Sequence, residues 1–176
     1  MSTAIKLSED EVREVARYAS QSVREVLDIF EIVHPGDLRP RAAVEAAWAF
    51  AQGSRRSNLL RDTAWEAMRA AQASTNDAAQ NAARSAMCAA SAAYLHPIAK
   101  ATQVRHILGA AAYAARACEL NAGEQRSIAE QSIERARLVA SPVLREVLNR
   151  YPPAPAGGGR VGELLRLLDD GLRQKD

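Results

Sequence analysis

The chain has 176 residues, a formal net charge of +2 and 25% charged residues. This length suits one compact domain, and the balanced charge gives no overall electrostatic case for a protein that binds nucleic acid or a membrane. Alanine makes up about a fifth of the sequence and aromatic residues only 5%, which favours helices because alanine loses no side-chain entropy in them. We therefore expect an all-α, alanine-rich bundle of about seven or eight helices with no sheet.

The N-terminal part of the chain predicts one long helix. Ser8 and Glu11 form a capping-box pair, in which each side chain accepts a backbone N–H that the helix start leaves unpaired. Apolar residues then recur at steps of three and four as far as Val33, which places them on one stripe of about seven helical turns. The segment His34-Pro35-Gly36 ends this helix, because a residue before proline avoids the α conformation and glycine permits the turn.

Two amphipathic helices are expected next. Pro40 suits the first turn of one helix, which should end near Gly53. The other should be capped by Ser54 or Ser57 and carries Trp65 beside its apolar stripe. The residues expected on the buried faces of these helices are Val44, Ala47, Trp48, Ala51, Leu59, Leu60, Ala64, Met68 and Ala71.

A fourth helix presents an almost side-chain-free face. The polar cluster Ser74 to Asp77 should cap its start, and His96-Pro97 should end or kink it. The alanines of this face are Ala79, Ala83, Ala86, Ala90 and Ala93. Such small residues predict close packing against another helix.

The rest of the chain predicts four more segments. Further helices are expected over residues 102–119, 124–140 and 142–149, so that residues 1–151 form the bundle domain. Residues 152–160, with the sequence PPAPAGGGR, predict a linker. Residues 161–176 predict an amphipathic helix, which by itself would be marginally stable in water. We expect this helix to dock on the bundle, and docking on a partner is the alternative.

Charge is distributed unevenly along the chain. Residues 1–40 hold eight acidic against five basic residues, whereas residues 41–118 hold nine basic against four acidic ones. The start of the chain turns acidic where a secretory signal would be apolar, and no apolar run is long enough to span a membrane. Cys88 and Cys118 both fall within helical patterns. We expect two buried thiols in a cytoplasmic protein without membrane contact.

No motif indicates an enzyme, a cofactor or a metal site. The three histidines, His34, His96 and His106, show no metal-ligand spacing, and residues 157–160 lack the Lys-Ser/Thr pair of a phosphate-binding loop. A nucleophilic role for either cysteine would require exposure, which a buried helix face does not provide. Asp37 could act with other carboxylates in acid–base chemistry, but a short acid at a helix start is better explained as a cap.

Nucleic-acid binding has one candidate patch. Arg55, Arg56 and Arg61 lie close in sequence to Trp65, whose ring could stack on a base. The patch is small and contains no recognised motif. A solvated surface is therefore the favoured interpretation.

Two segments resemble a known family. Residues 37–48, DLRPRAAVEAAW, are similar to the Asp-x-Arg-Pro-Arg-x-Ala-x-Glu-Ala motif of the immunity-five-like group of proteins from bacterial polymorphic toxin systems. Residues 108–117, LGAAAYAARA, resemble the second hallmark of that group, a helix with an Ala-Ala-Tyr-Ala core. The resemblance covers roughly Phe30 to Leu148 and does not extend to the final helix.

The resemblance implies a protein that binds and neutralises a cognate toxin by occlusion. Its motif residues and candidate partner contacts are Asp37, Arg39, Pro40, Arg41, Glu45, Trp48, Arg61, Trp65 and Tyr113. The acidic first helix would suit a basic toxin and the arginines an acidic one, and the sequence does not choose between them. A helical regulator that binds a ligand or nucleic acid is the alternative function, and a homodimer stays open.

Overall fold

The computed structural model describes residues 4–174, and over that range the chain forms nine α-helices and two short 3-10 helices. Within the same range no β-strand occurs, and one antiparallel bridge joins Ala4 to Ile98. The elements are α1 (Glu9–Arg24), α2 (Leu27–Val33), α3 (Arg39–Ala51), α4 (Asn58–Ala73), α5 (Asp77–Ser91), η1 (Ala92–Tyr94), η2 (Ala101–Gln103), α6 (Val104–Asn121), α7 (Arg126–Val139), α8 (Pro142–Asn149) and α9 (Gly159–Arg173). The all-α prediction is confirmed. No helix of the described part is long and apolar enough to cross a membrane.

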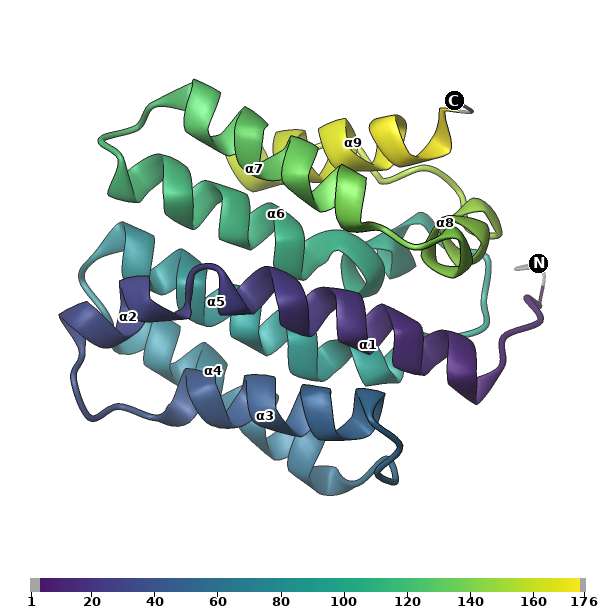
Figure 1. Ribbon diagram of the computed structural model, residues 1–176, viewed down its shortest axis with the longest axis horizontal. Coiled ribbons are helices and arrows are strands. Elements are labelled where there is room, and N and C mark those ends of the chain that lie inside the picture. Colours follow the sequence, from purple (N-terminus) through teal and green to yellow (C-terminus); the bar gives the residue numbers. More distant parts are fainter. Residues whose placement is uncertain (1–3, 175–176) are drawn as a thin grey trace.

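The pair α5 and α6 forms the centre of the fold, with α3 and α4 on one side and α7 and α9 on the other (Figure 1). The predicted alanine face is fully buried there, at Ala79, Ala83, Ala86, Ala90 and Ala93. Because methyl groups are the largest side chains on this face, the helix backbones approach closely. The hydroxyl of Ser85 on α5 donates a hydrogen bond of 2.6 Å to the carbonyl of Ala110 on α6.

The structure corrects the prediction of one helix as far as Val33. A turn at residues 25–26 separates α1 from α2. The backbone winds more tightly there, and the N–H of Val26 donates to the carbonyl of Val23 at 2.9 Å, three residues back. The change of direction lets Val26 and Phe30 join an apolar cluster with alanines of α4, α5 and α6. The helix therefore breaks at residues 25–26, because packing against these helices outweighs the continuous helical pattern of the sequence.

Three of the nine described helices, α1, α5 and α8, begin with a side-chain cap. The N–H of Ser8 donates to a Glu11 carboxylate oxygen at 2.8 Å, and the N–H of Glu11 donates to the Ser8 hydroxyl at 3.2 Å. Asn76 and Ser141 cap α5 and α8 through their side chains. Ser57 precedes α4 as expected, but its side chain makes no capping bond.

The last helix, α9, lies against α6 and α7. It begins at Gly159, earlier than expected. The preceding turn has φ angles of 86°, 79° and 59° at residues 157–159, which glycine adopts without strain. The apolar stripe of α9 is buried, at Leu164, Leu165, Leu168 and Leu172.

Side chains of α9 bind the backbone of residues 151–157. The buried Asp169 accepts the N–H of Ala154 at 2.8 Å. Arg166 donates to the carbonyl of Gly157 at 2.7 Å, and Arg173 donates to the carbonyl of Tyr151 at 3.0 Å. These bonds satisfy carbonyl and N–H groups in a segment that has no regular secondary structure.

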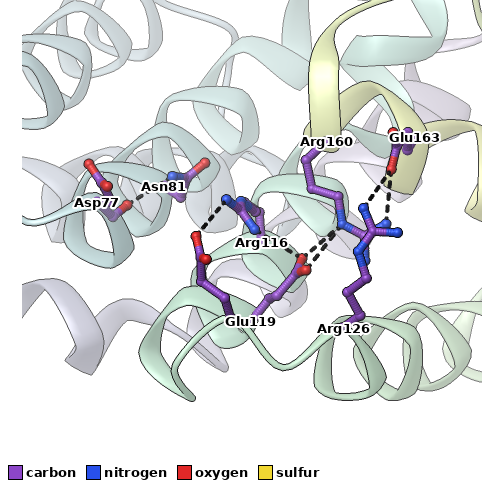
Figure 2. A network of polar contacts seen from close by, with 8 residues as sticks. Asp77, Asn81, Arg116, Glu119, Arg126, Arg160 and Glu163 are labelled. Atoms are coloured by element: carbon purple, nitrogen blue, oxygen red, sulfur yellow. Dashed lines mark hydrogen bonds and ion pairs between the residues drawn. The ribbon is translucent and has the colours of Figure 1, made fainter.

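A polar network around a buried carboxylate joins α6, α7 and α9 (Figure 2). Glu119 on α6 is only 2% exposed, and its two carboxylate oxygens lie 3.1 and 3.2 Å from Nε of Arg160 on α9. Arg116 lies 3.3 Å from the same carboxylate. Arg160 also donates to Glu163 at 3.1 Å, and Arg126 on α7 lies 3.8 Å from Glu163. The buried negative charge is thus compensated by two arginines, one of them from α9.

Candidate partner-binding surface

Asp37 and Arg39, at the turn before α3, bond to each other. One oxygen of Asp37 accepts from Nη2 of Arg39 at 2.7 Å, and the other accepts from Nε at 2.9 Å and from the backbone N–H at 3.2 Å. The hydrogen bonds from the Arg39 side chain are the main reason that the pKa of Asp37 is lowered. Asp37 therefore stabilises the first residue of α3, although the N-cap position itself belongs to Leu38.

Arg41 is also paired inside the molecule. Its Nε and Nη2 each donate to one oxygen of Glu31 at 2.7 Å, in a two-bond fork that ties α3 to α2. Pro40 is buried and lies in the first turn of α3, a position that suits its fixed φ angle. Arg39 and Arg41 thus both make internal ion pairs, while their side chains stay 37% and 45% exposed.

A charged groove lies beside this corner. The guanidinium of Arg24 lies 4.1 Å from the ring centroid of Trp48, in a cation–π contact that covers part of the indole. The groove has a volume of about 450 Å³ and is lined by Arg24, Leu27, Asp28, Glu31, Arg41, Val44 and Glu45. Its lining carries charges of both signs, so the groove favours no particular charge on a ligand.

Trp65 on α4 is the most exposed aromatic side chain named in the sequence prediction, with 61% of its surface accessible. It forms one wall of a mainly apolar pocket of about 250 Å³ between α4 and α5. The pocket is lined by Arg61, Ala64, Trp65, Met68, Met87, Ser91 and Tyr94. On the other side of the indole, Asp62, Glu66 and Arg69 line a polar hollow.

Tyr113 lines neither the groove nor the Trp65 pocket. It is half-buried on α6, and burial is the main cause that raises the pKa of its hydroxyl. The predicted residues therefore occupy three places: the corner before and within α3, the pocket beside Trp65, and the surface of α6.

Sequence reasoning missed part of the pocket. Met87 and Ser91 come from α5 and Tyr94 from η1, whereas Trp65 and Met68 come from α4. Helical spacing assigns each residue to a face of its own helix, but it does not say which faces of two helices meet. Met68 and Leu59 had been expected on the buried face of their helix; Met68 is instead partly exposed at the pocket, and Leu59 is 58% exposed.

The histidines and cysteines show structural contacts. His34 lies 2.7 Å from the hydroxyl of Ser74, and His106 lies 3.0 Å from a backbone carbonyl. Burial raises the pKa of Cys88 to about 12, so its thiol stays protonated at neutral pH. Across residues 4–174, no group of three His, Cys, Asp or Glu side chains could hold a metal ion.

The family model described as "Imm-5 like putative immunity protein" matches residues 6–140. The chain belongs to this family. The matched residues of the Imm-5 like chain include the corner before α3 and the whole Trp65 pocket, and they end before α8 and α9. No match was found among curated proteins or among solved structures.

Proposed function

We propose that this Imm-5 like protein binds a cognate bacterial toxin and neutralises it by covering the toxin's active-site cleft. Membership of an immunity-protein family supports a toxin as the partner. The observation that carries the proposal is the exposed Trp65 beside an apolar pocket. A large aromatic surface left in water at the mouth of a pocket is typical of a protein-binding site.

The residues of the pocket suit this role. Tryptophan, tyrosine and arginine contribute most often to the strong contacts of protein interfaces, and all three occur here as Trp65, Tyr94 and Arg61. Met68 and Met87 are flexible side chains that can adjust to the shape of a partner. Because the residues stand on packed helices, little backbone entropy is lost on binding.

The corner before α3 supports the proposal less directly. Arg39 and Arg41 would have to exchange their internal carboxylates for those of a partner. We therefore propose that Asp37, Arg39 and Arg41 stabilise the fold and that Trp65 contacts the toxin. We also propose that the protein acts by binding, without turnover, in the cytoplasm, where Cys88 and Cys118 would stay reduced.

Co-expression with the toxic domain encoded beside this protein tests the function. We expect the immunity protein to restore growth and to co-purify with that domain. Failure of both rescue and co-purification would show that the proposed function is wrong.

Trp65→Ala tests the place of contact. We expect at least a tenfold loss of affinity for the toxin, as for a typical interface anchor. The free energy of unfolding should change by less than about 0.5 kcal/mol, because the indole is exposed. Leu138→Ala is a matched control on α7, where Leu138 is 66% exposed, and it should leave the affinity unchanged. Equal binding by Trp65→Ala and the wild type would place the contact elsewhere.

A further inference from the structure

Several arginines near the Trp65 pocket have no carboxylate partner. Most arginines of the described chain lie within 4.0 Å of a carboxylate, as Arg41 does with Glu31 and Arg150 with Glu11. Within residues 4–174, no ion pair is found for Arg61, Arg84 or Arg105. The positive charge of these side chains is therefore available to a partner.

These arginines share one surface with the pocket. On α5, Arg84 stands one turn before Met87, so both lie on the same face of the helix, where each is partly exposed. Arg61 lines the pocket on α4, and α5 lies between α4 and α6. Arg105 on α6 lies next to α5. Its side chain and that of Cys88 on α5 both lie close to the position that a Cβ on Gly109 would occupy.

The charges of Arg84 and Arg105 both act on Tyr113 of α6. Burial raises the pKa of its hydroxyl, and the positive charges of Arg105 and Arg84 both act in the opposite direction. Arg84 and Arg105 are therefore both near enough to Tyr113 for their charges to act on its hydroxyl. We call the surface formed by Arg61, Met68, Arg84, Met87 and Arg105 the arginine surface.

Carboxylates are scarce around the arginine surface. The only acid on α5 is Asp77, in its first turn, and the only acid on α6 is the buried Glu119. Asp62 and Glu66 lie on the far side of Trp65, where Glu66 is paired with Arg69. The surface thus combines unpaired positive charge with an apolar pocket that can hold one large side chain.

We propose that the arginine surface binds an acidic surface of the toxin, whose carboxylates pair with Arg61, Arg84 and Arg105 while an apolar side chain fills the Met68–Met87 pocket. This inference rests on the proposed function and specifies the chemistry of the partner. Complementary charge speeds encounter and excludes partners of the wrong sign, and the apolar contact slows dissociation.

The pocket favours a protein partner over a nucleic acid. Asp62 and Glu66 lie next to Trp65. A nucleic acid carries a negative charge on every nucleotide, whereas a protein can place its carboxylates at the arginines and an uncharged side chain at the indole. Tyr94 has its hydroxyl bonded to the carbonyl of Ser57 at 3.1 Å, and its ring lies 5.8 Å from the guanidinium of Arg61. Of the two aromatic residues of the pocket, Trp65 is thus the one with the exposed ring, whereas a single strand needs successive stacking platforms.

The double variant Arg84→Glu/Arg105→Glu tests the inference, because it leaves the pocket itself intact. Toxin binding is measured for the full-length protein, from about 50 to about 500 mM NaCl. We expect at least a tenfold loss of affinity, mainly through slower association, and a smaller salt dependence than in the wild type. Arg126→Glu/Arg135→Glu is the matched control on α7; it makes the same charge change and should alter the affinity less than about twofold.

Each outcome has a defined meaning. If the wild type neutralises the toxin and Arg84→Glu/Arg105→Glu binds equally well, the inference is wrong and the proposed function stands. If the wild type itself neither binds nor rescues growth, both are wrong. Arg84→Gln/Arg105→Gln replaces the double variant if circular dichroism shows that the latter does not fold. Wild-type binding to an oligo-dT strand of about 20 nucleotides, lost in the double variant, would assign the surface to nucleic acid instead.

Discussion

Glu119 is a carboxylate buried between three helices, and its substitution should be costly. Removing one partner of a buried ion pair leaves the other charges without compensation, which costs about 3–5 kcal/mol. In Glu119→Ala, Arg116 and Arg160 would lose the carboxylate that both contact. We expect a loss of about 3 kcal/mol in the free energy of unfolding, measured by urea denaturation.

Glu146→Ala is the control for this prediction. Glu146 is 72% exposed, and its partner Arg150 keeps a second carboxylate at Glu11. An exposed pair of this kind contributes about 0–1 kcal/mol. If Glu119→Ala and Glu146→Ala destabilise the protein equally, the buried network does not hold α9 in place.

Glu11 should make the stability of the fold sensitive to acid. Hydrogen bonds from the Arg150 side chain, with those from Ser8, lower the pKa of Glu11 from 4.5 to about 2. A lowered pKa in the folded state stabilises the fold above the unfolded value, and this contribution disappears as the pH falls from about 4.5 to about 2. Melting temperatures measured across this pH range should fall less steeply for Glu11→Gln than for the wild type. An unchanged slope would contradict the role of this ion pair.

At the scale of single elements, two glycines of α9 should respond oppositely to alanine. A Cβ at Gly162 would lie 1.9 Å from the carbonyl oxygen of Gly157, so the turn before α9 would have to move. We expect Gly162→Ala to destabilise the protein by about 1–3 kcal/mol, as overpacking does. At Gly171 a Cβ would lie 3.1 Å from Cδ of Arg137, a side chain bonded to Glu134, which is 55% exposed. A shift of Arg137 by a few tenths of an ångström makes room, so Gly171→Ala should stabilise α9 by up to about 1 kcal/mol. Thermal melts of both variants check the contrast, and equal shifts would contradict it.

The sequence predicted those helices whose ends depend on local chemistry. The capping box at Ser8, the proline at Pro40 and the cap within the cluster Ser74 to Asp77, at Asn76, act within one helical turn, and each is found where the pattern placed it. The turn at residues 25–26 was missed because no local breaker marks it. It depends on the burial of Phe30 against distant helices, which periodicity alone does not reveal.

The candidate site was predicted only in part, for the same physical reason. Trp65 and Arg61 were identified because their residue types are common at interfaces. Their neighbours Met87 and Tyr94 come from elements that meet α4 only in the folded molecule. The carboxylate that pairs with Arg41 was likewise not predicted, since Glu31 lies on the preceding helix across a turn.

At the scale of the whole molecule, α9 completes the core although it lies outside the family match. Its buried leucines join the same cluster as residues of α1, α3 and α6. We therefore propose that α9 and the bundle unfold together as one cooperative unit, despite the irregular segment between them.

Leu168→Ala tests this cooperativity. Leu168 is fully buried, so the substitution should cost about 2–5 kcal/mol, whereas Leu167→Ala at the exposed neighbour should cost less than about 0.5 kcal/mol. Trp48 and Trp65 report on α3 and α4 by fluorescence, and far-ultraviolet circular dichroism reports on all helices. In one cooperative unit, both signals should change at the same urea concentration in the wild type and shift together in Leu168→Ala. An early loss of helix signal with unchanged fluorescence would instead show that α9 unfolds separately from the bundle.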